Sequence, residues 1–422
     1  MKVLVIGSGG REHAVCAALK KSPRVTELLC APGNGGISQI AECVPVKATD
    51  IDGVVALAKE RKVDYVVVTP DDPLALGMVD ALEAAGIRAF GPRANAAIIE
   101  ASKVFSKSLM KKYGIPTAKW ESFDDMEAAL AYLRKVGAPI VVKADGLALG
   151  KGVVVAETLD EAEDAVRSMM LDKKFGQSGA RVVIEERMTG PELTVLCFTD
   201  GKTIVQMPSS RDHKRAYDDD KGPNTGGMGA FCPVADYTPE LAERCLREIF
   251  VPTIEAMNAE GRKFKGVIYF GLMLTPDGPK VVEYNARFGD PETQPVLALL
   301  ETDLLDVFEA VTDERLSDID VKWKKSCACC VVIASGGYPV AYMSGYEIHG
   351  LDEAGKIATV FHAGTKAENG KFYTNGGRVL GVTAVADSME EAVRTAYAAA
   401  DKISFENMHM RRDIAKSAFT VR

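Results

Sequence analysis

Short apolar runs alternate with helical patterns along the first hundred residues. A helical pattern extends from His13 to Lys20. Strand-like apolar runs lie at 2–7, 25–30, 64–70 and 87–92. Strands separated by helices are typical of βαβ units, which build a parallel sheet. We therefore predict an N-terminal parallel α/β domain of Rossmann-like type over residues 1–103.

The pattern changes beyond Pro116. Strand-like runs at 139–143, 153–156 and 182–186 are separated by glycines and by two helix starts. One helix start is at Ser122, and the other is a capping box formed by Thr158 and Glu161. This order predicts a small antiparallel α+β lobe over 118–190, which a connecting helix and linker over 104–117 would join to the first domain.

The rest of the chain divides into two segments. Residues 191–326 contain a helix start at Pro239 and strand patterns at 193–198, 266–270 and 280–284. Residues 327–422 contain a capped helix start at Ser388 and strand patterns at 331–333 and 380–385. We predict a large mixed lobe for the first segment and a small α+β domain for the second.

Composition narrows the class of protein. The chain has 422 residues, of which 47% are hydrophobic and 26% are charged, and its net charge is −8. At about 150 residues per domain, this length suggests roughly two to four domains. An acidic chain without a basic block is not expected to bind nucleic acid or an anionic membrane. The chain also lacks a run of about 18 apolar residues that could span a bilayer.

Cysteine usage and the N-terminus indicate the compartment. Nine cysteines are scattered through mostly apolar runs, and MKVLVIG leads into a strand without the features of a secretory leader. We therefore expect a soluble, reduced, cytoplasmic protein. Cys327, Cys329 and Cys330 include a C-x-x-C spacing without a second ligand pair, so a buried strand is favoured over a zinc site.

Glycines follow the first strand at Gly7, Gly9 and Gly10. The backbone N–H groups of such a turn can face a phosphate at a helix N-terminus. The dinucleotide fingerprint G-x-G-x-x-G, however, needs a glycine where this chain has Glu12. This acid argues against NAD and leaves a small phosphorylated ligand or a purely structural turn.

A second glycine-rich segment follows Lys143. It contains Gly146, Gly150, Lys151 and Gly152. Such a hairpin can fold over a polyphosphate, with the lysines neutralising charge, although it lacks the Walker spacing. An ordinary hairpin with a solvated lysine is the alternative.

Acidic and basic groups follow in the next segment. Glu185 and Glu186 end a strand, where they either face solvent or belong to a hinge that holds a purine, with Glu192 available for ribose hydroxyls. The basic run 211–215 alone would be a solvated face. Its closeness to the glycine-rich loop 222–229, which carries Asn and Thr, instead suggests an anionic substrate.

The stretch 282–294 carries the most informative pattern. On a strand, Glu283, Asn285 and Arg287 would share one face. Two oxygen ligands suit Mg²⁺, and a guanidinium beside them suits the γ-phosphate of a nucleotide. A surface ion-pair ladder is the alternative for the same residues.

Together these motifs resemble those of a known family. The phosphoribosylamine–glycine ligases, also called glycinamide ribonucleotide synthetases, have motifs similar to GSGGREHA, APGN, KADGLALGKGV, DHKR, GPNTGGMGA, RFGDPETQ and NGGRVL. The resemblance runs from Met1 to about Arg412, and RFGDPETQ and GPNTGGMGA are its most specific parts. It implies a two-lobed ATP-grasp core between the N-terminal and C-terminal domains.

The resemblance also implies an activity. Members of this family join glycine to 5-phosphoribosylamine in de novo purine biosynthesis, consuming ATP and releasing ADP and phosphate. The glycine carboxylate would attack the γ-phosphate, and the sugar amine would then attack the resulting glycyl phosphate. The implied cofactors are ATP and Mg²⁺ or Mn²⁺, and we expect a monomer or a weak homodimer.

Site residues are implied by position. Arg287 and Lys143 would be catalytic, and Glu283 and Asn285 would bind the metal. The implied ATP contacts are Lys103, Lys143, Gly150, Lys151, Gly152, Glu185, Glu186, Met188 and Glu192. The implied substrate contacts are Gly9, Gly10, Arg11, Asp71, Asp212, Lys214, Asn224, Thr225, Gly226, Arg287, Asn375, Gly376, Gly377 and Arg378.

Three residues depart from the family pattern. Asp71 stands where the family commonly has Glu, Arg211 where Gln commonly precedes DHKR, and Leu149 where a small residue is usual.

Other functions remain as alternatives: a different ATP-grasp ligase such as a carboxylase, a dinucleotide-binding oxidoreductase, or a non-catalytic nucleotide-binding regulator. Glu12 argues against the oxidoreductase, and Glu283, Asn285 and Arg287 argue against the regulator.

Overall fold

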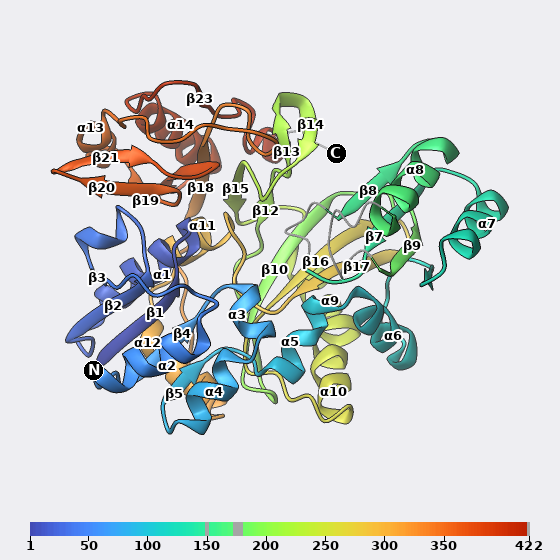
Figure 1. Cartoon of the computed structure of the whole chain (residues 1–422), viewed down its shortest axis with the longest axis horizontal. Helices are drawn as coiled ribbons and strands as arrows, with labels where there is room; N and C mark the ends of the chain where they lie inside the picture. The colour runs from blue at the N-terminus through green and yellow to red at the C-terminus, as the bar shows by residue number, and fades with distance from the viewer. Residues whose placement is uncertain (148–151, 172–179, 420–422) are drawn as a thin grey trace.

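The computed structural model describes residues 1–147, 152–171 and 180–419. Figure 1 shows the N-terminal domain at the lower left and the C-terminal domain above it. The small lobe projects on the opposite side, and the strands of the large lobe lie between. Among the described residues, no helix has both the length and the apolar character needed to cross a membrane.

The N-terminal domain is built on a parallel sheet, as predicted. Its strand order is β3-β2-β1-β4-β5. The strands are β1 (Lys2–Gly7), β2 (Glu27–Pro32), β3 (Glu42–Cys43), β4 (Tyr65–Val68) and β5 (Arg88–Phe90). The helices are α1 (Gly10–Lys20), α2 (Ile51–Glu60), α3 (Asp71–Ala75), α4 (Met78–Ala84) and α5 (Ala94–Ala101), with the 3₁₀ turn η1 (Ile37–Gln39). Helix α6 (Lys103–Tyr113) leads to the small lobe.

Both faces of this sheet are buried, which explains the continuous apolar runs. One face packs on helices of the domain that include α2 and α4, and the other packs on α1 and on α12 (Leu304–Thr312), which is far away in sequence. Phe308 of α12 stacks on Phe90 at 3.9 Å between ring centroids, and its carbonyl accepts from the Tyr65 hydroxyl at 2.9 Å. The N-terminal domain therefore depends on a helix from the large-lobe segment.

The small lobe is an antiparallel sheet with two helices on one face. Its strand order is β6-β9-β7-β8. Figure 1 shows both helices on the outer side of this sheet. The elements are β6 (Trp120–Phe123), α7 (Met126–Val136), β7 (Ile140–Ala144), β8 (Val153–Ala156), α8 (Leu159–Met170) and β9 (Val182–Glu186).

The two predicted helix starts of the small lobe had different outcomes. The capping box at Thr158 is confirmed, because its hydroxyl accepts from the Glu161 N–H. The start at Ser122 is wrong, since Ser122 lies in β6 and pairs with Val183. Asp125 caps α7 instead, because its carboxylate can accept an N–H of the first turn while Ser122 is still held by the sheet.

The large lobe contains the sheet β11-β10-β16-β17. Its strands are β10 (Glu192–Thr199), β11 (Ile204–Gln206), β16 (Gly266–Thr275) and β17 (Gly278–Asn285). The hairpin β13 (Arg215–Tyr217) and β14 (Lys221–Asn224) is joined by the 3₁₀ turn η3 (Asp218–Asp220). The helical elements are α9 (Pro239–Cys245), η4 (Leu246–Phe250), α10 (Val251–Ala259), α11 (Thr293–Ala298) and η5 (Leu316–Asp318). Thr238 caps α9, which begins with proline as predicted.

A further sheet combines the last two segments of the chain. Its order is β12-β15-β18-β22-β19, and β23 also pairs with β18. Strands β12 (Arg211–Asp212) and β15 (Gly229–Cys232) come from before residue 326. The later elements are β18 (Cys327–Ser335), α13 (Leu351–Gly355), β19 (Thr359–His362), β20 (Thr365–Glu368), β21 (Lys371–Thr374), β22 (Arg378–Ala386), α14 (Met389–Ala400), β23 (Met408–His409) and η6 (Lys416–Phe419). Hydrogen bonding therefore continues across residue 326.

The cysteine group lies on β18 as a buried strand. Cys329 and Cys330 are fully buried in the sheet, and Cys327 is partly exposed at its start. All nine cysteines fall within the described residues, and all are free thiols. The prediction of a buried strand is confirmed.

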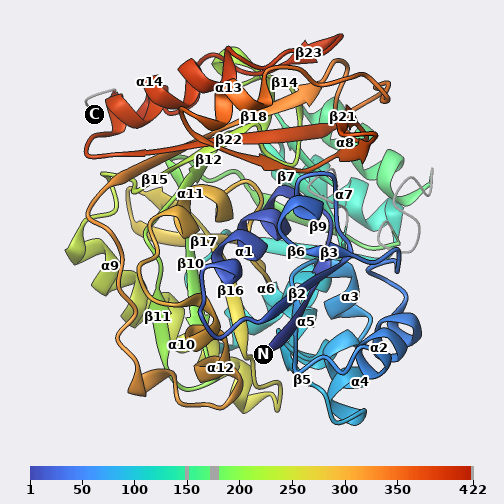
Figure 2. The same ribbon diagram turned by 90° about the vertical axis from the view of Figure 1, so that its left-hand side faces the viewer.

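Two buried histidines join the first and last domains, which lie against each other in Figure 2. The His362 N–H donates to His13 Nδ1 at 2.8 Å. Burial lowers the pKa of His13 to about 3, and the neighbouring His362 acts in the same direction. Burial also lowers the pKa of His362 to about 4. An unperturbed histidine titrates near 6.5, so the folded chain holds both rings neutral.

We expect acid to destabilise this joint. Between about pH 6 and pH 4, the unfolded chain binds a proton at each histidine that the folded chain excludes. The unfolding free energy therefore falls as the pH falls, with a contribution of up to about 2.7 kcal/mol per pH unit from the pair. Urea unfolding across this range measures the slope, and His362→Gln is expected to reduce it. The exposed His349 provides the control His349→Gln; equal slopes for wild type and His362→Gln would contradict the prediction.

Candidate active site

The predicted nucleotide-binding and metal-binding residues meet where the small lobe adjoins the large lobe. Lys143 on β7 is buried, and its ammonium donates to the Val282 carbonyl on β17 at 3.1 Å. We use the name central site for Lys103, Lys143, Glu192, Lys214, Glu283, Asn285 and Arg287.

Glu185 pairs with two buried lysines. Its carboxylate forms ion pairs with Lys143 and with Lys107 of α6, and all three side chains are nearly inaccessible to solvent. Burial acts to raise the pKa of Glu185, but the two ammonium groups outweigh it and lower the pKa. Burial lowers the pKa of Lys107 to about 8, against the opposing effect of Glu185. The Glu185 backbone is paired on both sides, with Trp120 and Val141, which fixes the position of its carboxylate. The carboxylate in turn orients the Lys107 and Lys143 ammonium groups.

Lys103 lies in the first turn of α6, after the cap residue Ser102. Its ammonium donates to the Gly146 carbonyl at 2.8 Å, at the start of the glycine segment. Burial lowers the pKa of Lys103, and the nearby Lys143 acts in the same direction, although Glu283 opposes it. Lys103 and Lys143 thus bring two cations close together from different elements.

The other predicted ATP contacts occupy the small-lobe edge. Glu186 ends β9 and accepts from the Lys119 N–H at 3.0 Å, and Met188 follows, half-buried, in the loop to β10. The Gly152 carbonyl accepts from the Ala144 N–H at 2.8 Å. Gly150 and Lys151, and the departure at Leu149, lie outside the described residues.

Glu283 and Asn285 share one face of β17, as the alternation predicts. A β-bulge at Val282 shifts the register just before them, since Gly271 pairs with Glu283 and Leu272 with Val281. A bulge re-aims the following side chains and is common beside functional sites. Arg287 lies beyond the strand, but its guanidinium donates to the Asn285 side-chain oxygen at 3.2 Å.

The donor set of Glu283 and Asn285 fits a hard divalent cation. A carboxylate and an amide oxygen are the ligand types that Mg²⁺ and Mn²⁺ prefer. Glu283 is separated from the Lys214 ammonium by 3.9 Å, beyond hydrogen-bond distance. Within residues 1–147, 152–171 and 180–419, no group of three or more His, Cys, Asp or Glu could hold a metal alone. Phosphate oxygens would therefore have to complete the coordination.

Arg287 is held by Glu100, a residue that the sequence analysis did not single out. The two side chains form an ion pair at 2.9 Å, and Glu100 also accepts from the Ala286 N–H at 2.7 Å. Burial raises the pKa of Glu100 to about 7 despite Arg287, and Asp71 on α3 adds to the rise. Among the described residues, the buried Nε of Arg287 has no hydrogen-bond partner, as expected of a donor that awaits an anion.

Asp212 and Lys214 extend the central site toward the C-terminal half. The Lys214 ammonium lies 2.9 Å from the Glu192 carboxylate. The backbone carbonyl of Lys214 accepts from both the N–H and the hydroxyl of Thr225. The Lys214 charge is the main reason that the pKa of Glu192 is lowered. Burial, opposed by Lys214, raises the pKa of Asp212 to about 7.

The N-terminal glycine turn is closed by Glu12. Its carboxylate accepts from the Gly9 N–H at 2.6 Å and from the Thr69 hydroxyl at 2.8 Å. An acid therefore occupies the helix N-terminus where a dinucleotide pyrophosphate would lie. Gly7 has φ +126°, and a Cβ there would overlap Glu12. This geometry agrees with the argument against NAD.

Asp290 joins the two arginines predicted to hold a sugar phosphate. Its carboxylate accepts from the Arg11 N–H at 3.4 Å and lies 3.6 Å from Arg378. Burial acts to raise the pKa of Asp290, but Arg378 and Arg11 outweigh it and lower the pKa. Arg378 also donates to the Gly226 carbonyl at 2.7 Å, so residues from four distant segments meet here.

The remaining predicted substrate residues surround this point. Gly10 packs so closely on Gln294 that a Cβ would overlap its amide. Gly376 and Gly377 contribute only their backbone. The Gly376 carbonyl accepts from the Ser335 hydroxyl at 2.9 Å, and the Gly377 carbonyl accepts from the Ser335 N–H at 2.8 Å. Asn224 pairs with Arg215 in the β13–β14 hairpin, and Asn375 is exposed.

Arg211, one of the departures, does not enter the central site. Its guanidinium donates to the Glu192 carbonyl, to Asp236 and to the Ser417 hydroxyl.

Three residues that contact the predicted site residues were given no role by the sequence analysis: Glu100, Lys107 and Asp290. Asp290 lies within RFGDPETQ and could have been found there, whereas a glutamate or lysine inside a helix has no distinguishing local pattern.

Comparison with known families covers almost the entire chain. Three family models match: the N domain of phosphoribosylglycinamide synthetase over residues 1–100, its ATP-grasp (A) domain over 101–293 and its C domain over 328–417. A relative from Xanthomonas axonopodis pv. citri, named phosphoribosylamine–glycine ligase, is 50% identical over 418 residues, covering 98% of this chain and 97% of the relative.

Solved structures agree with the family match. The crystal structure of a phosphoribosylamine–glycine ligase from Thermotoga maritima superposes with a TM-score of 0.87 at 34% identity, covering 98% of this chain and 100% of that one. A biotin carboxylase from Campylobacter jejuni has a TM-score of 0.75 at 15% identity, covering 97% of this chain and 93% of that one. The second likeness shows only that the fold is shared.

Proposed function

Because this chain belongs to the phosphoribosylglycinamide synthetase, or phosphoribosylamine–glycine ligase, family of ATP-grasp enzymes, we propose that its central site joins glycine to 5-phosphoribosylamine at the expense of ATP. The convergence of Lys143, Glu283, Asn285 and Arg287 at the junction of the two lobes carries this proposal. It brings cations and oxygen donors together as phosphoryl transfer requires. The product would be glycinamide ribonucleotide, in purine biosynthesis.

The reaction divides into two displacements. A glycine carboxylate oxygen attacks the γ-phosphorus of ATP. The bond from the γ-phosphorus to the oxygen that bridges it to the β-phosphate breaks, and ADP leaves. The sugar amine then attacks the carbonyl carbon of glycyl phosphate, phosphate leaves, and a proton departs from the nitrogen. Holding both partners in one site favours the second step, since effective molarities of aligned groups can reach the order of 10⁵ M or more.

Individual residues would divide the work by charge. Lys103 and Lys143 neutralise the ATP phosphates, while Glu185 keeps Lys143 in place. Arg287, oriented by Glu100, stabilises charge on the transferring phosphoryl group. Arg11 and Arg378, brought together by Asp290, attract the sugar phosphate, and Asp212 and Lys214 line the path between the two substrates.

A divalent ion, Mg²⁺ or Mn²⁺, would be bound by Glu283 and Asn285. Bound there, the ion supplies Lewis-acid stabilisation of phosphate oxygens. Glu192, Glu186 and Met188 would surround the nucleoside. We also propose a cytoplasmic location, because the nine cysteines are all free thiols, and a monomer or weak homodimer.

One assay tests the function together with the metal assignment. Release of ADP should require Mg²⁺, glycine and phosphoribosylamine generated in situ, all present together. Glu283→Gln keeps the side-chain shape but removes a charged ligand, so the Mg²⁺ concentration for half-maximal rate should rise by roughly tenfold or more. Glu248→Gln, at a partly exposed ion pair on α9–η4, is the control. ADP release without either substrate would refute the ligase function, and an unchanged Mg²⁺ requirement in Glu283→Gln would refute the metal role.

A further inference from the structure

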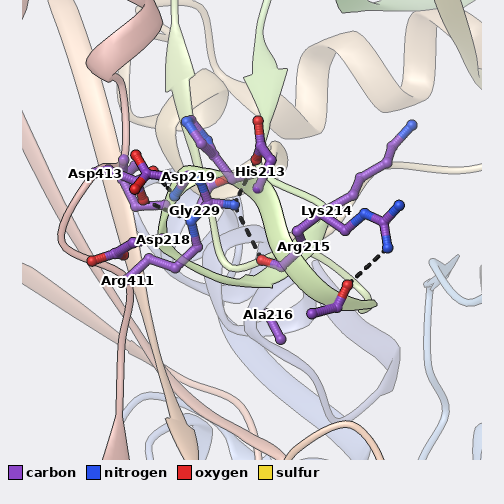
Figure 3. Close-up of polar contacts among 12 residues, drawn as sticks. His213, Lys214, Arg215, Ala216, Asp218, Asp219, Gly229, Arg411 and Asp413 are labelled. Atoms are coloured by element: carbon purple, nitrogen blue, oxygen red, sulfur yellow. Dashed lines mark hydrogen bonds and ion pairs between the residues drawn. The ribbon is translucent and has the colours of Figure 1, made fainter.

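The C-terminal segment 409–417 lies along residues 211–220, which carry Asp212 and Lys214 (Figure 3). The paired contacts are His409 Nε2 with the Ala216 carbonyl at 2.7 Å, Arg411 Nη1 with the Arg215 carbonyl at 3.1 Å, Arg412 N–H with Asp218 Oδ1 at 2.7 Å, Ala415 N–H with His213 Nε2 at 3.2 Å, and Arg211 Nη1 with Ser417 Oγ at 3.3 Å. His409, Arg411, Ala415 and Ser417 meet residues 216, 215, 213 and 211 in turn, so the two segments run in opposite directions along residues 211–216. Arg412 instead contacts Asp218, which lies in the turn η3.

Arg411 is the centre of this contact. Its side chain is only 1% exposed, and it forms a forked pair with Asp413 at 2.7 and 2.8 Å. The same guanidinium lies 2.9 Å from Asp220, and Asp413 accepts from the Asp219 N–H at 2.9 Å. A forked arginine–carboxylate pair is both strong and geometrically specific. Arg411 thus fixes a turn by contacts that a lysine could not reproduce.

The turn that Arg411 holds is not one that the local backbone favours. Asp219 and Asp220 have φ of +56° and +51°, in the left-handed region. Non-glycine residues enter this region at a cost, which aspartate bears better than most. The hairpin conformation therefore depends on the C-terminal contacts.

Alternation along the chain connects this contact to the central site. Side chains of an extended segment point alternately to opposite sides. Arg211 and His213 face the C-terminal segment, whereas Lys214 extends away from it in Figure 3. Burial, together with Arg411, lowers the pKa of His213 to about 4, so its ring stays neutral and Nε2 can accept from Ala415.

On the opposite side, Lys214 meets the acids of the central site. Its ammonium contacts Glu192 at 2.9 Å and lies 3.9 Å from Glu283. The position of this ammonium depends on the backbone of residues 213–215, which is held between Thr225 and the C-terminal segment. A shift of this backbone would move Lys214 relative to both acids.

We propose that residues 409–417 position Asp212 and Lys214 for the glycine and sugar substrates, with Arg411 as the main positioning residue. The proposal rests on the proposed function, which places Asp212 and Lys214 at the substrates. It assigns a role to the C-terminal segment that the motifs did not indicate. Arg411 touches neither substrate and acts only through the 211–220 backbone.

The test compares two weakened contacts with a matched control. Arg411→Lys keeps the charge but loses the fork, and Asp220→Asn weakens the contact from the exposed hairpin side without emptying the core. Arg412→Ala is the control, because the Arg412 side chain is exposed, pairs with Asp401 and lies over the Tyr397 ring, while its backbone N–H to Asp218 is retained. KM for ATP, glycine and phosphoribosylamine and kcat are measured for each, with hydrogen exchange of amides 212–226.

A positioning role predicts a specific kinetic split. In Arg411→Lys and Asp220→Asn, KM for glycine or phosphoribosylamine should rise by roughly tenfold or more, with KM for ATP unchanged and Arg412→Ala like wild type. Unchanged substrate KM in both variants, or a fall in kcat alone, would overturn the proposal. If Arg411→Lys does not fold, the substrate KM of Asp220→Asn alone decides whether the proposal stands.

The catalytic function and the positioning role of residues 409–417 can be refuted separately. Wild-type protein that releases ADP without needing both substrates would refute the proposed function. In that case, faster exchange of amides 212–226 in the two variants than in Arg412→Ala would still support the contact as a positioning device, and equal exchange would refute it.

Discussion

Replacing Arg287 by alanine is expected to reduce turnover by roughly 10³-fold or more, with ATP binding largely retained. Arginines that stabilise a transferring phosphoryl group contribute on this scale. The buried Nε of Arg287 lacks a partner within the part of the chain that the structure describes, and the guanidinium lies beside the proposed metal ligand Asn285. The binding of ATP depends mainly on Lys103, Lys143 and the small lobe. Single-turnover ADP formation and equilibrium ATP binding measure the two quantities separately.

The loss of Arg287 also leaves Glu100 without its cation, so stability must be separated from catalysis. The pKa of Glu100 is already raised to about 7 by burial, and the carboxyl can become protonated when Arg287 is absent. The double variant Arg287→Ala with Glu100→Gln should therefore recover stability but not turnover. Arg93→Ala removes an arginine that is 57% exposed and serves as the control. Near-normal turnover in the Arg287 variant would refute its assigned role.

The second large effect is expected from Glu185→Gln. This change leaves Lys107 and Lys143 buried without their carboxylate, while their side chains remain almost inaccessible. Removing one partner of a buried ion pair typically costs about 3–5 kcal/mol, because the remaining charge is not solvated. We expect a loss of this order in the unfolding free energy, measured by urea denaturation near neutral pH.

A matched surface change tests whether burial is the cause. Glu163 pairs with the exposed Arg134 and with Arg167 on α7 and α8. Glu163→Gln is expected to cost far less stability than Glu185→Gln, because a surface pair remains solvated. Adding Lys107→Met to Glu185→Gln should restore part of the stability, since it removes one unpaired charge. Equal costs for Glu185→Gln and Glu163→Gln would contradict the explanation.

Local patterns predicted most of the elements and the order of the domains. The parallel N-terminal sheet, the antiparallel small lobe, the helix caps at Thr158 and Ser388 and the helix start at Pro239 are confirmed. Within each of these features the strands and helices are set by residues near one another in sequence, so local patterns are enough to indicate them. The family resemblance is also confirmed, by family models and full-length relatives.

Predictions failed or were missing where distant segments decide the outcome. Strand β3 was not predicted, because two residues without a strong apolar pattern are ordered by pairing with β2. Ser122 resembled a helix cap but is held in β6 by β9. The pairing of β15 with β18 was not predicted either, since backbone hydrogen bonds leave no trace in side-chain composition. The individual site assignments stay predictions until the variants are measured.

The sequence by itself determined the chemical types available at the site: lysines near glycines, oxygen donors on one strand face, and an arginine after them. Only the tertiary structure decided how each charge is held. Glu185 orients two lysines, Glu100 holds Arg287, Asp290 lies beside Arg378, and Arg411 fixes the hairpin behind Lys214. The physical reason is that burying a charge requires a partner at close range. That partner can come from any part of the chain, so its identity is decided by packing and not by spacing.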